Sequence, residues 1–136
     1  MDWLRDFVTK RDIEQRNAEE RGKLYAKQLH DELSKVTPMV HRLLYDLGRA
    51  YFGTDWLSPL REKFQIVKDD YYHTWRLQRP YLSGYFEVSL KMEMGTPPCF
   101  KVVSGAGDIF TKDTSEAELK RVLHIAAEQG TYSDPR

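Results

Sequence analysis

Cysteine is almost absent from this sequence. Its one cysteine, Cys99, cannot form a disulfide within the chain, whereas small secreted domains usually carry a larger, even set. A zinc site built from paired cysteines is excluded for the same reason. The first residues, Met-Asp-Trp-Leu-Arg-Asp-Phe, mix charged with apolar side chains and lack the apolar stretch of a signal peptide. We therefore expect a cytoplasmic protein.

Long apolar runs and a surplus of one charge are also missing. No segment approaches the roughly 20 apolar residues that a membrane-spanning helix needs. The chain has 21 basic and 21 acidic residues, whereas nucleic-acid-binding proteins usually carry a basic surplus. We expect neither a membrane nor a nucleic acid as partner. A net charge near zero also does little to keep two copies of the chain apart.

What the sequence does contain is enough apolar material for one core. Hydrophobic residues make up 40% and aromatic residues 12% of the 136 residues, which suits a single folded domain. We predict an α+β fold. Residues 1–53 are expected to form a helical segment, residues 56–130 an antiparallel sheet plus a helix, and residues 131–136 a flexible tail.

Apolar residues recur at alternating steps of three and four between residues 26 and 50, which is typical of a helix with one apolar face. Pro38 lies within this pattern and is expected to kink the helix near Thr37. Because the apolar pattern keeps its phase across Pro38, we predict one long kinked helix and not two. Gly53 is a plausible residue at which it ends.

The length of this helix suggests a function. A helix from Glu14 to Tyr51 would span roughly 55 Å, but a compact domain of this size measures less than about 40 Å across. Part of the helix should project and contact a protein partner, most simply a second copy in a homodimer. The predicted partner-binding residues are Leu29, Leu33, Val36, Val40, Leu43 and Leu47. The alternative, in which they pack on the chain's own sheet or last helix, stays open.

A strand with one apolar face is predicted where apolar residues alternate with polar ones, at Phe86, Val88, Leu90, Met92 and Met94. Further strands are expected at 64–67, 71–77, 99–104 and 109–111, with turns at 68–70 and 95–98. The result is a four- or five-stranded antiparallel meander. If Phe100 or Val102 lies opposite Met92, the apolar faces of the two strands match.

The last helix has the clearest local signals. Ser115-Glu116-Ala117-Glu118 forms a capping box, in which a serine and a glutamate three residues later satisfy free backbone groups. An apolar stripe follows at Leu119, Val122, Leu123 and Ala126. Gly130 suits the position after the helix. We predict that this helix packs on the apolar face of the sheet.

Candidates for chemistry are few. His30 and His41 would lie about 16 Å apart along one helix and cannot share a metal. His73 is the histidine with acidic neighbours in sequence, Asp69 and Asp70. Cys99 at a strand start is expected to be a structural thiol. We predict no catalytic residue, metal or cofactor.

The leading hypothesis is a non-enzymatic protein-interaction or oligomerisation module that acts through the amphipathic N-terminal helix. An alternative is a small-ligand or peptide-binding domain with an aromatic pocket between sheet and helices, lined by Tyr71, His73, Trp75 and Phe86. A second alternative is an enzyme of unrecognised type, because catalytic residues that are distant in sequence can meet in a fold.

Overall fold

The computed structural model describes residues 2–53, 60–67, 70–78, 84–93 and 95–132. These residues form helix α1, strands β1 to β5 and helix α2, in that order along the chain. The chain divides into two compact units, Met1–Ser34 and Lys35–Arg136. Helix α1 (Asp2–Phe52) contributes to both, so the first unit is one helical segment and the second holds the rest of α1, the sheet and α2.

Helix α1 is continuous, with Pro38 inside it. The prediction of a single helix across this proline is therefore confirmed. Gly53 follows the last helical residue with a φ of 100°, a conformation that glycine adopts without strain. Within the described residues, neither helix combines the length and the apolar composition that crossing a membrane requires.

Five antiparallel strands form one sheet in the order β1-β2-β3-β4-β5, so each strand pairs with the next in sequence. This is the predicted meander with five strands. The strands are β1 (Arg61–Val67), β2 (Asp70–Gln78), β3 (Tyr85–Met92), β4 (Cys99–Ser104) and β5 (Gly107–Phe110).

The register puts the apolar residues of the central strands on one face. Val88 lies opposite both Trp75 of β2 and Val102 of β4, and Leu90 lies opposite Phe100. The predicted match of apolar faces is thus realised, although Phe100 lies opposite Leu90 and not opposite Met92. A slip by one residue would have turned Lys101 into the core.

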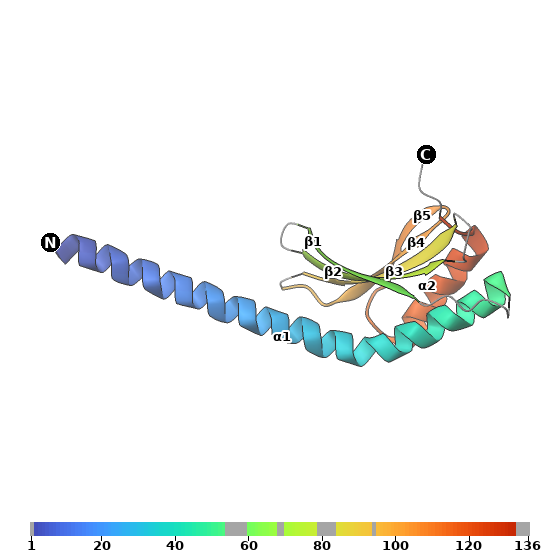
Figure 1. Ribbon diagram of the computed structural model, residues 1–136, viewed down its shortest axis with the longest axis horizontal. Coiled ribbons are helices and arrows are strands. Elements are labelled where there is room, and N and C mark those ends of the chain that lie inside the picture. The colour runs from blue at the N-terminus through green and yellow to red at the C-terminus, as the bar shows by residue number, and fades with distance from the viewer. Residues whose placement is uncertain (1, 54–59, 68–69, 79–83, 94, 133–136) are drawn as a thin grey trace. The chain divides into compact units, whose positions relative to one another are not determined.

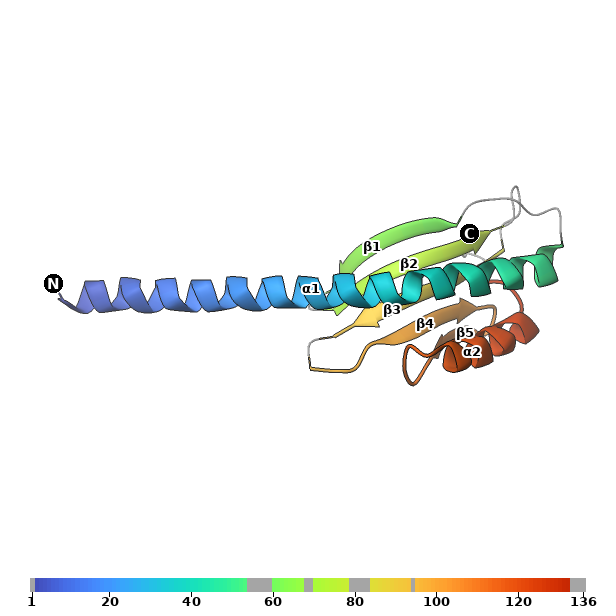
Figure 2. The same ribbon diagram turned by 90° about the horizontal axis from the view of Figure 1, so that it is seen from below.

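Both helices of the second unit lie on this apolar face of the sheet (Figures 1 and 2). Helix α2 (Glu116–Gln129) packs against β4 and β5 and buries its predicted stripe, Leu119, Val122, Leu123 and Ala126. The part of α1 after residue 34 buries Val36, Val40, Leu43 and Leu44. The ring of Tyr51 packs edge-on against Phe86 of β3, with 4.9 Å between the ring centroids.

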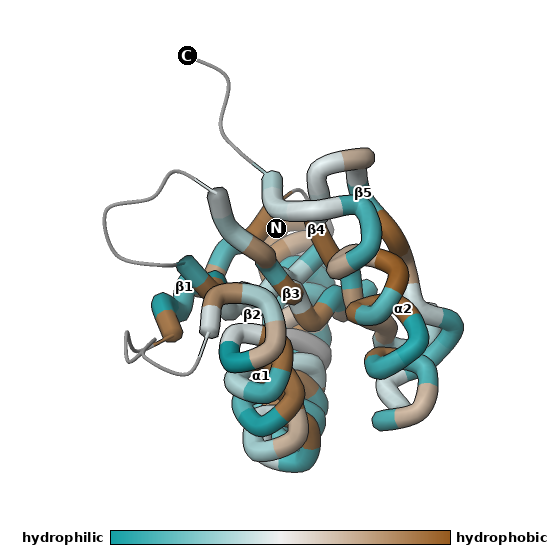
Figure 3. Tube along the Cα trace, turned by 90° about the vertical axis from the view of Figure 1, so that its right-hand side faces the viewer, coloured by the Kyte–Doolittle hydropathy of each residue, from teal (hydrophilic) through white to brown (hydrophobic). Residues whose placement is uncertain are grey.

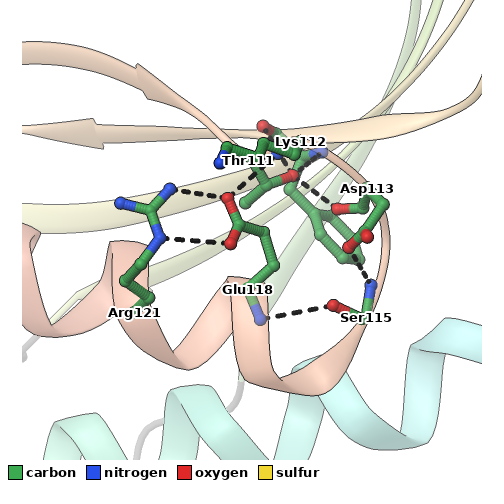
Figure 4. Close-up of polar contacts among 7 residues, drawn as sticks. Thr111, Lys112, Asp113, Ser115, Glu118 and Arg121 are labelled. Atoms are coloured by element: carbon green, nitrogen blue, oxygen red, sulfur yellow. Dashed lines mark hydrogen bonds and ion pairs between the residues drawn. The ribbon is translucent and has the colours of Figure 1, made fainter.

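The start of α2 is held by one half of the predicted capping box (Figure 4). The other half is wrong, because the backbone N–H of Ser115 bonds to the Asp113 carboxylate and not to that of Glu118. Ser115 is the N-cap, and its hydroxyl accepts a hydrogen bond from the backbone N–H of Glu118 at 3.3 Å. The Glu118 carboxylate in turn accepts bonds from the Arg121 guanidinium, at 2.5 and 3.1 Å, and from the backbone N–H of Lys112, at 3.1 Å. The hydrogen bond from Arg121, followed by that from Lys112, lowers the pKa of Glu118 from 4.5 to about 2.

Several predicted boundaries shift. Strand β1 begins at Arg61, three residues before the predicted start, and β5 occupies Gly107–Phe110 where 109–111 was expected. Gly105 and Ala106 form the turn between β4 and β5. The backbone of Tyr132, in the predicted tail, makes two hydrogen bonds of 2.9 Å with Tyr85. Residues 68–69, Met94 and 133–136 lie outside the described residues.

Candidate functional site

The predicted partner-binding residues do not share one environment. Val36, Val40 and Leu43 are buried in the unit that contains the sheet, and Leu29 is buried as well. Leu33 and Leu47 are partly buried. From Val36 to Leu44, the apolar face of the helix therefore packs within the chain, which was the alternative left open by the sequence. Whether the six residues also bind a partner stays a prediction.

Exposed apolar side chains occur instead at the beginning of α1. Leu4, Phe7 and Val8 are 40%, 60% and 52% exposed. Their spacing places them on one side of the helix within its first turns. We call these three residues the front patch. The apolar spacing of these residues is visible in the sequence, but their exposure is known only from the structure.

The four residues of the predicted aromatic pocket do lie on one face of the sheet. Tyr71, His73 and Trp75 alternate along β2, and Phe86 of β3 lies opposite Leu77 on the same face. Trp75 and Phe86 are 0% exposed, so their side chains touch neither solvent nor a cavity large enough for water. Both are packing residues of the core, and ligand binding by this group stays a prediction.

Two histidines and one glutamate meet where α1 crosses the sheet edge. The Nε2 atom of His41 lies 3.1 Å from Oε1 of Glu62, and Nε2 of His73 lies 3.2 Å from Oε2 of the same carboxylate. Each imidazole can donate an N–H to one carboxylate oxygen. The cluster connects α1 to β1 and β2, and the His73 ring packs on Trp75 with 4.6 Å between the centroids.

The sequence did not reveal this cluster. In the sequence, the acidic residues nearest to His73 are Asp69 and Asp70. In the structure, the pairing of β1 with β2 brings Glu62 beside His73. Glu62 lies opposite Trp75. Trp75 and His73 are two residues apart on β2, so Glu62 lies on the same face of the sheet as His73. Only the β1–β2 register, which depends on where β1 begins, could have shown the contact. Among the described residues, no three or more His, Cys, Asp or Glu side chains are arranged to hold a metal ion.

A cavity of about 460 Å³ lies between α1 and the start of α2, lined by Lys35, Val36, Met39, Asp113, Thr114, Ser115 and Glu116. Two of its polar groups, Ser115 and Asp113, already have structural roles. The Ser115 hydroxyl caps α2, and the Asp113 carboxylate accepts the backbone N–H of Ser115 at 2.9 Å. Hydrogen bonding from the Ser115 side chain, followed by that from its backbone N–H, lowers the pKa of Asp113. The Ser115 and Asp113 side chains that line the cavity are therefore already engaged within the chain.

Cys99 does not have the setting of a reactive thiol. Its side chain is partly buried on β4, and this burial raises the pKa of the thiol above its usual value. A raised pKa leaves less thiolate near neutral pH, and the thiolate is the nucleophilic form. This setting agrees with the structural role expected from the sequence.

Exposed apolar side chains of the sheet gather on its first strand. All seven residues of β1 are exposed, among them Phe64, Ile66 and Val67. The neighbouring strand β2 is partly or fully buried at every position. Strand β1 is also at the end of the sheet, so one of its backbone edges is unpaired within the described residues.

Comparisons with known proteins do not assign a role to any of these features. No protein-family model, curated protein or solved structure matches the chain.

Proposed function

We propose that the protein is a non-enzymatic interaction module that forms a homodimer through the apolar face of its N-terminal helix. The observation that carries the proposal is the exposure of the front patch, Leu4, Phe7 and Val8. In this proposal α1 has two roles. Its later turns belong to the core of the chain itself, and its first turns bind the second copy.

The physics of isolated helices supports this division. The first turns of α1 expose Leu4, Phe7 and Val8, and a stretch of helix with few tertiary contacts is only marginally stable in water. An apolar patch on such a helix is stabilised when it packs against another apolar surface. Burying one large apolar side chain contributes about 1.5–3 kcal/mol before the entropic costs of association.

The charges of the helix allow self-association. Residues 2–13 include three acidic and three basic side chains, so two such segments do not repel each other through net charge. The whole chain is likewise neutral, with 21 residues of each sign. A second copy is therefore an electrostatically acceptable partner, and it is always present at the concentration of the protein itself.

We also propose a cytoplasmic location for this module. Cys99 is a free cysteine in the structure, and it is the only cysteine of the chain. A chain without disulfides suits a reducing compartment.

Light scattering coupled to size exclusion tests the proposal. At micromolar concentration the wild-type chain should elute with twice its 16.0 kDa mass. Phe7→Asp should shift the population to monomer, because it places a charge in the front patch. Thr9→Asp is the matched control, since it introduces the same charge two residues later, about 200° around the helix. A monomeric wild type, or equal effects of both substitutions, would remove the proposal.

A further inference from the structure

Strand β1 has exposed side chains at every position, and one of its backbone edges pairs with no other described strand. It lies at the end of the sheet, and all seven of its residues are exposed. An unpaired edge offers a row of N–H and C=O groups that an incoming strand can continue. Both hydrophilic and hydrophobic residues occur along this strand (Figure 3).

The two faces of β1 differ in chemistry. Phe64 and Ile66 lie opposite His73 and Tyr71, on the face that the helices cover elsewhere in the sheet. They are 49% and 55% exposed. A strand beside β1 would place every second side chain next to these two residues. Apolar side chains at those positions would bury part of the exposed surface.

The other face of β1 carries two cations, Arg61 and Lys63, that have no acidic partner among the described residues. Arg61 lies opposite Arg76, and Lys63 lies opposite Thr74. Within the described residues, neither Arg61 nor Lys63 forms an ion pair. The nearby acid Glu87 is already engaged, because the Arg76 guanidinium donates to it at 3.1 and 3.2 Å. Like charges directly opposite each other in a sheet are unfavourable, so an added acidic side chain beside Arg61 would offset its repulsion from Arg76.

We propose that the β1 edge binds an extended segment of a partner protein in which acidic residues alternate with apolar ones. The segment adds a sixth strand to the sheet. Its backbone pairs with β1, its apolar side chains pack on Phe64 and Ile66, and its acidic side chains face Arg61 and Lys63. This surface is separate from the front patch of α1, so the inference goes beyond the proposed homodimer.

A second copy of β1 fits this edge less well than an acidic strand does. On β1, the face that carries Arg61 and Lys63 also carries Gln65 and Val67. A second copy of β1, paired antiparallel about a two-fold axis, would present the same four residues on that face. The copy would therefore bring more cations and no carboxylate to that face. Charged residues on an edge strand also keep unsuitable strands away, so Arg61 and Lys63 should select for acidic partners.

Fluorescence anisotropy with synthetic peptides tests the proposal on the full chain. The probe is a labelled peptide of the length of β1, seven residues, in which valine alternates with glutamate. The control peptide alternates valine with lysine. We expect the glutamate peptide to bind at least about tenfold more tightly, with an advantage that falls as salt screens the charges. Equal binding of the two peptides by the wild-type chain overturns the proposal.

Charge reversal on the protein gives the second arm. The double variant Arg61→Glu/Lys63→Glu should prefer the lysine peptide, and it removes the like-charge pair with Arg76, so folding should not suffer. Lys112→Glu is the control, because it makes the same kind of change at an exposed position after the opposite edge strand. A double variant that keeps its preference for the glutamate peptide overturns the proposal, as does an equal change in Lys112→Glu.

Peptide methylation separates strand addition from simple charge attraction. An added strand presents the amides of every second residue to β1. Two methylated forms of the glutamate peptide are compared, one with every valine amide N-methylated and one with every glutamate amide N-methylated. One of these two forms should lose binding, and the other should keep it. Equal binding of both methylated peptides overturns the proposal.

The last arm separates this inference from the proposed homodimer. Phe7→Asp, which disrupts the front patch, should leave peptide affinity unchanged. Loss of the dimer with intact peptide binding would show that the peptide binds at the β1 edge and not through the dimer interface. If no peptide binds and Phe64→Lys turns a dimer into a monomer, the edge belongs to a second copy and the proposal is wrong.

Discussion

Replacing Leu44 by alanine should lower the free energy of unfolding by about 3 kcal/mol. Leu44 lies on α1 within the sheet-containing unit and is 0% exposed. The substitution removes three buried carbon atoms, each contributing about 0.8 kcal/mol, and the remaining cavity adds to the loss. The expected value therefore falls in the range of about 2.5–5 kcal/mol seen for buried leucines.

Leu24→Ala is the matched comparison on the same helix. Leu24 is 59% exposed, so its removal should change stability by less than about 0.5 kcal/mol. Urea unfolding followed by circular dichroism, at one protein concentration for all chains, gives both values. A cost below about 1 kcal/mol for Leu44→Ala, or equal costs for the two variants, would show that the later turns of α1 do not belong to the core.

Two further substitutions test how β4, the following loop and α2 are joined. Thr111→Val should cost about 1–3 kcal/mol in urea unfolding, because the buried Thr111 hydroxyl accepts the backbone N–H of Phe100 at 2.8 Å and the valine leaves that donor unsatisfied; an unchanged midpoint would contradict this. Glu118→Gln should lower the melting temperature at neutral pH. The folded-state pKa of Glu118 is depressed to about 2 by Arg121 and Lys112, so the carboxylate stabilises the fold above its unfolded pKa, and this contribution is lost as the pH falls from about 4.5 to about 2. Melting temperatures of wild type and variant should therefore converge over that range, and a constant difference would contradict the assignment.

Local signals in the sequence predicted the sheet-containing unit well. The N-cap at Ser115 needs only residues close in sequence, and its hydroxyl accepts the backbone N–H of Glu118 as expected. The reciprocal half of the capping box does not form, because the backbone N–H of Ser115 bonds to Asp113 and not to Glu118. Strand β4 has the predicted bounds because Pro97 and Pro98 precede it and a glycine turn follows. The meander order follows from short connections between consecutive strands.

Non-local features could not be read from the same patterns. The seam through Val36, Val40 and Leu43 has the periodicity of a partner-binding helix and of a core helix alike, so only the fold shows that these three residues are buried. Strand β1 starts with three charged residues, Arg-Glu-Lys, and their pattern does not predict a strand. Without that start, the contact of Glu62 with His73 stays hidden.

Sedimentation equilibrium of the wild-type, Phe7→Asp and Thr9→Asp chains tests most directly whether the first turns of α1 join two copies. The account predicts a wild-type dimer whose dissociation constant rises at least about tenfold in Phe7→Asp, as expected when one large apolar contact is lost. Thr9→Asp should match the wild type. Identical dissociation constants for all three chains, or a wild type that remains monomeric across the concentration series, would contradict it.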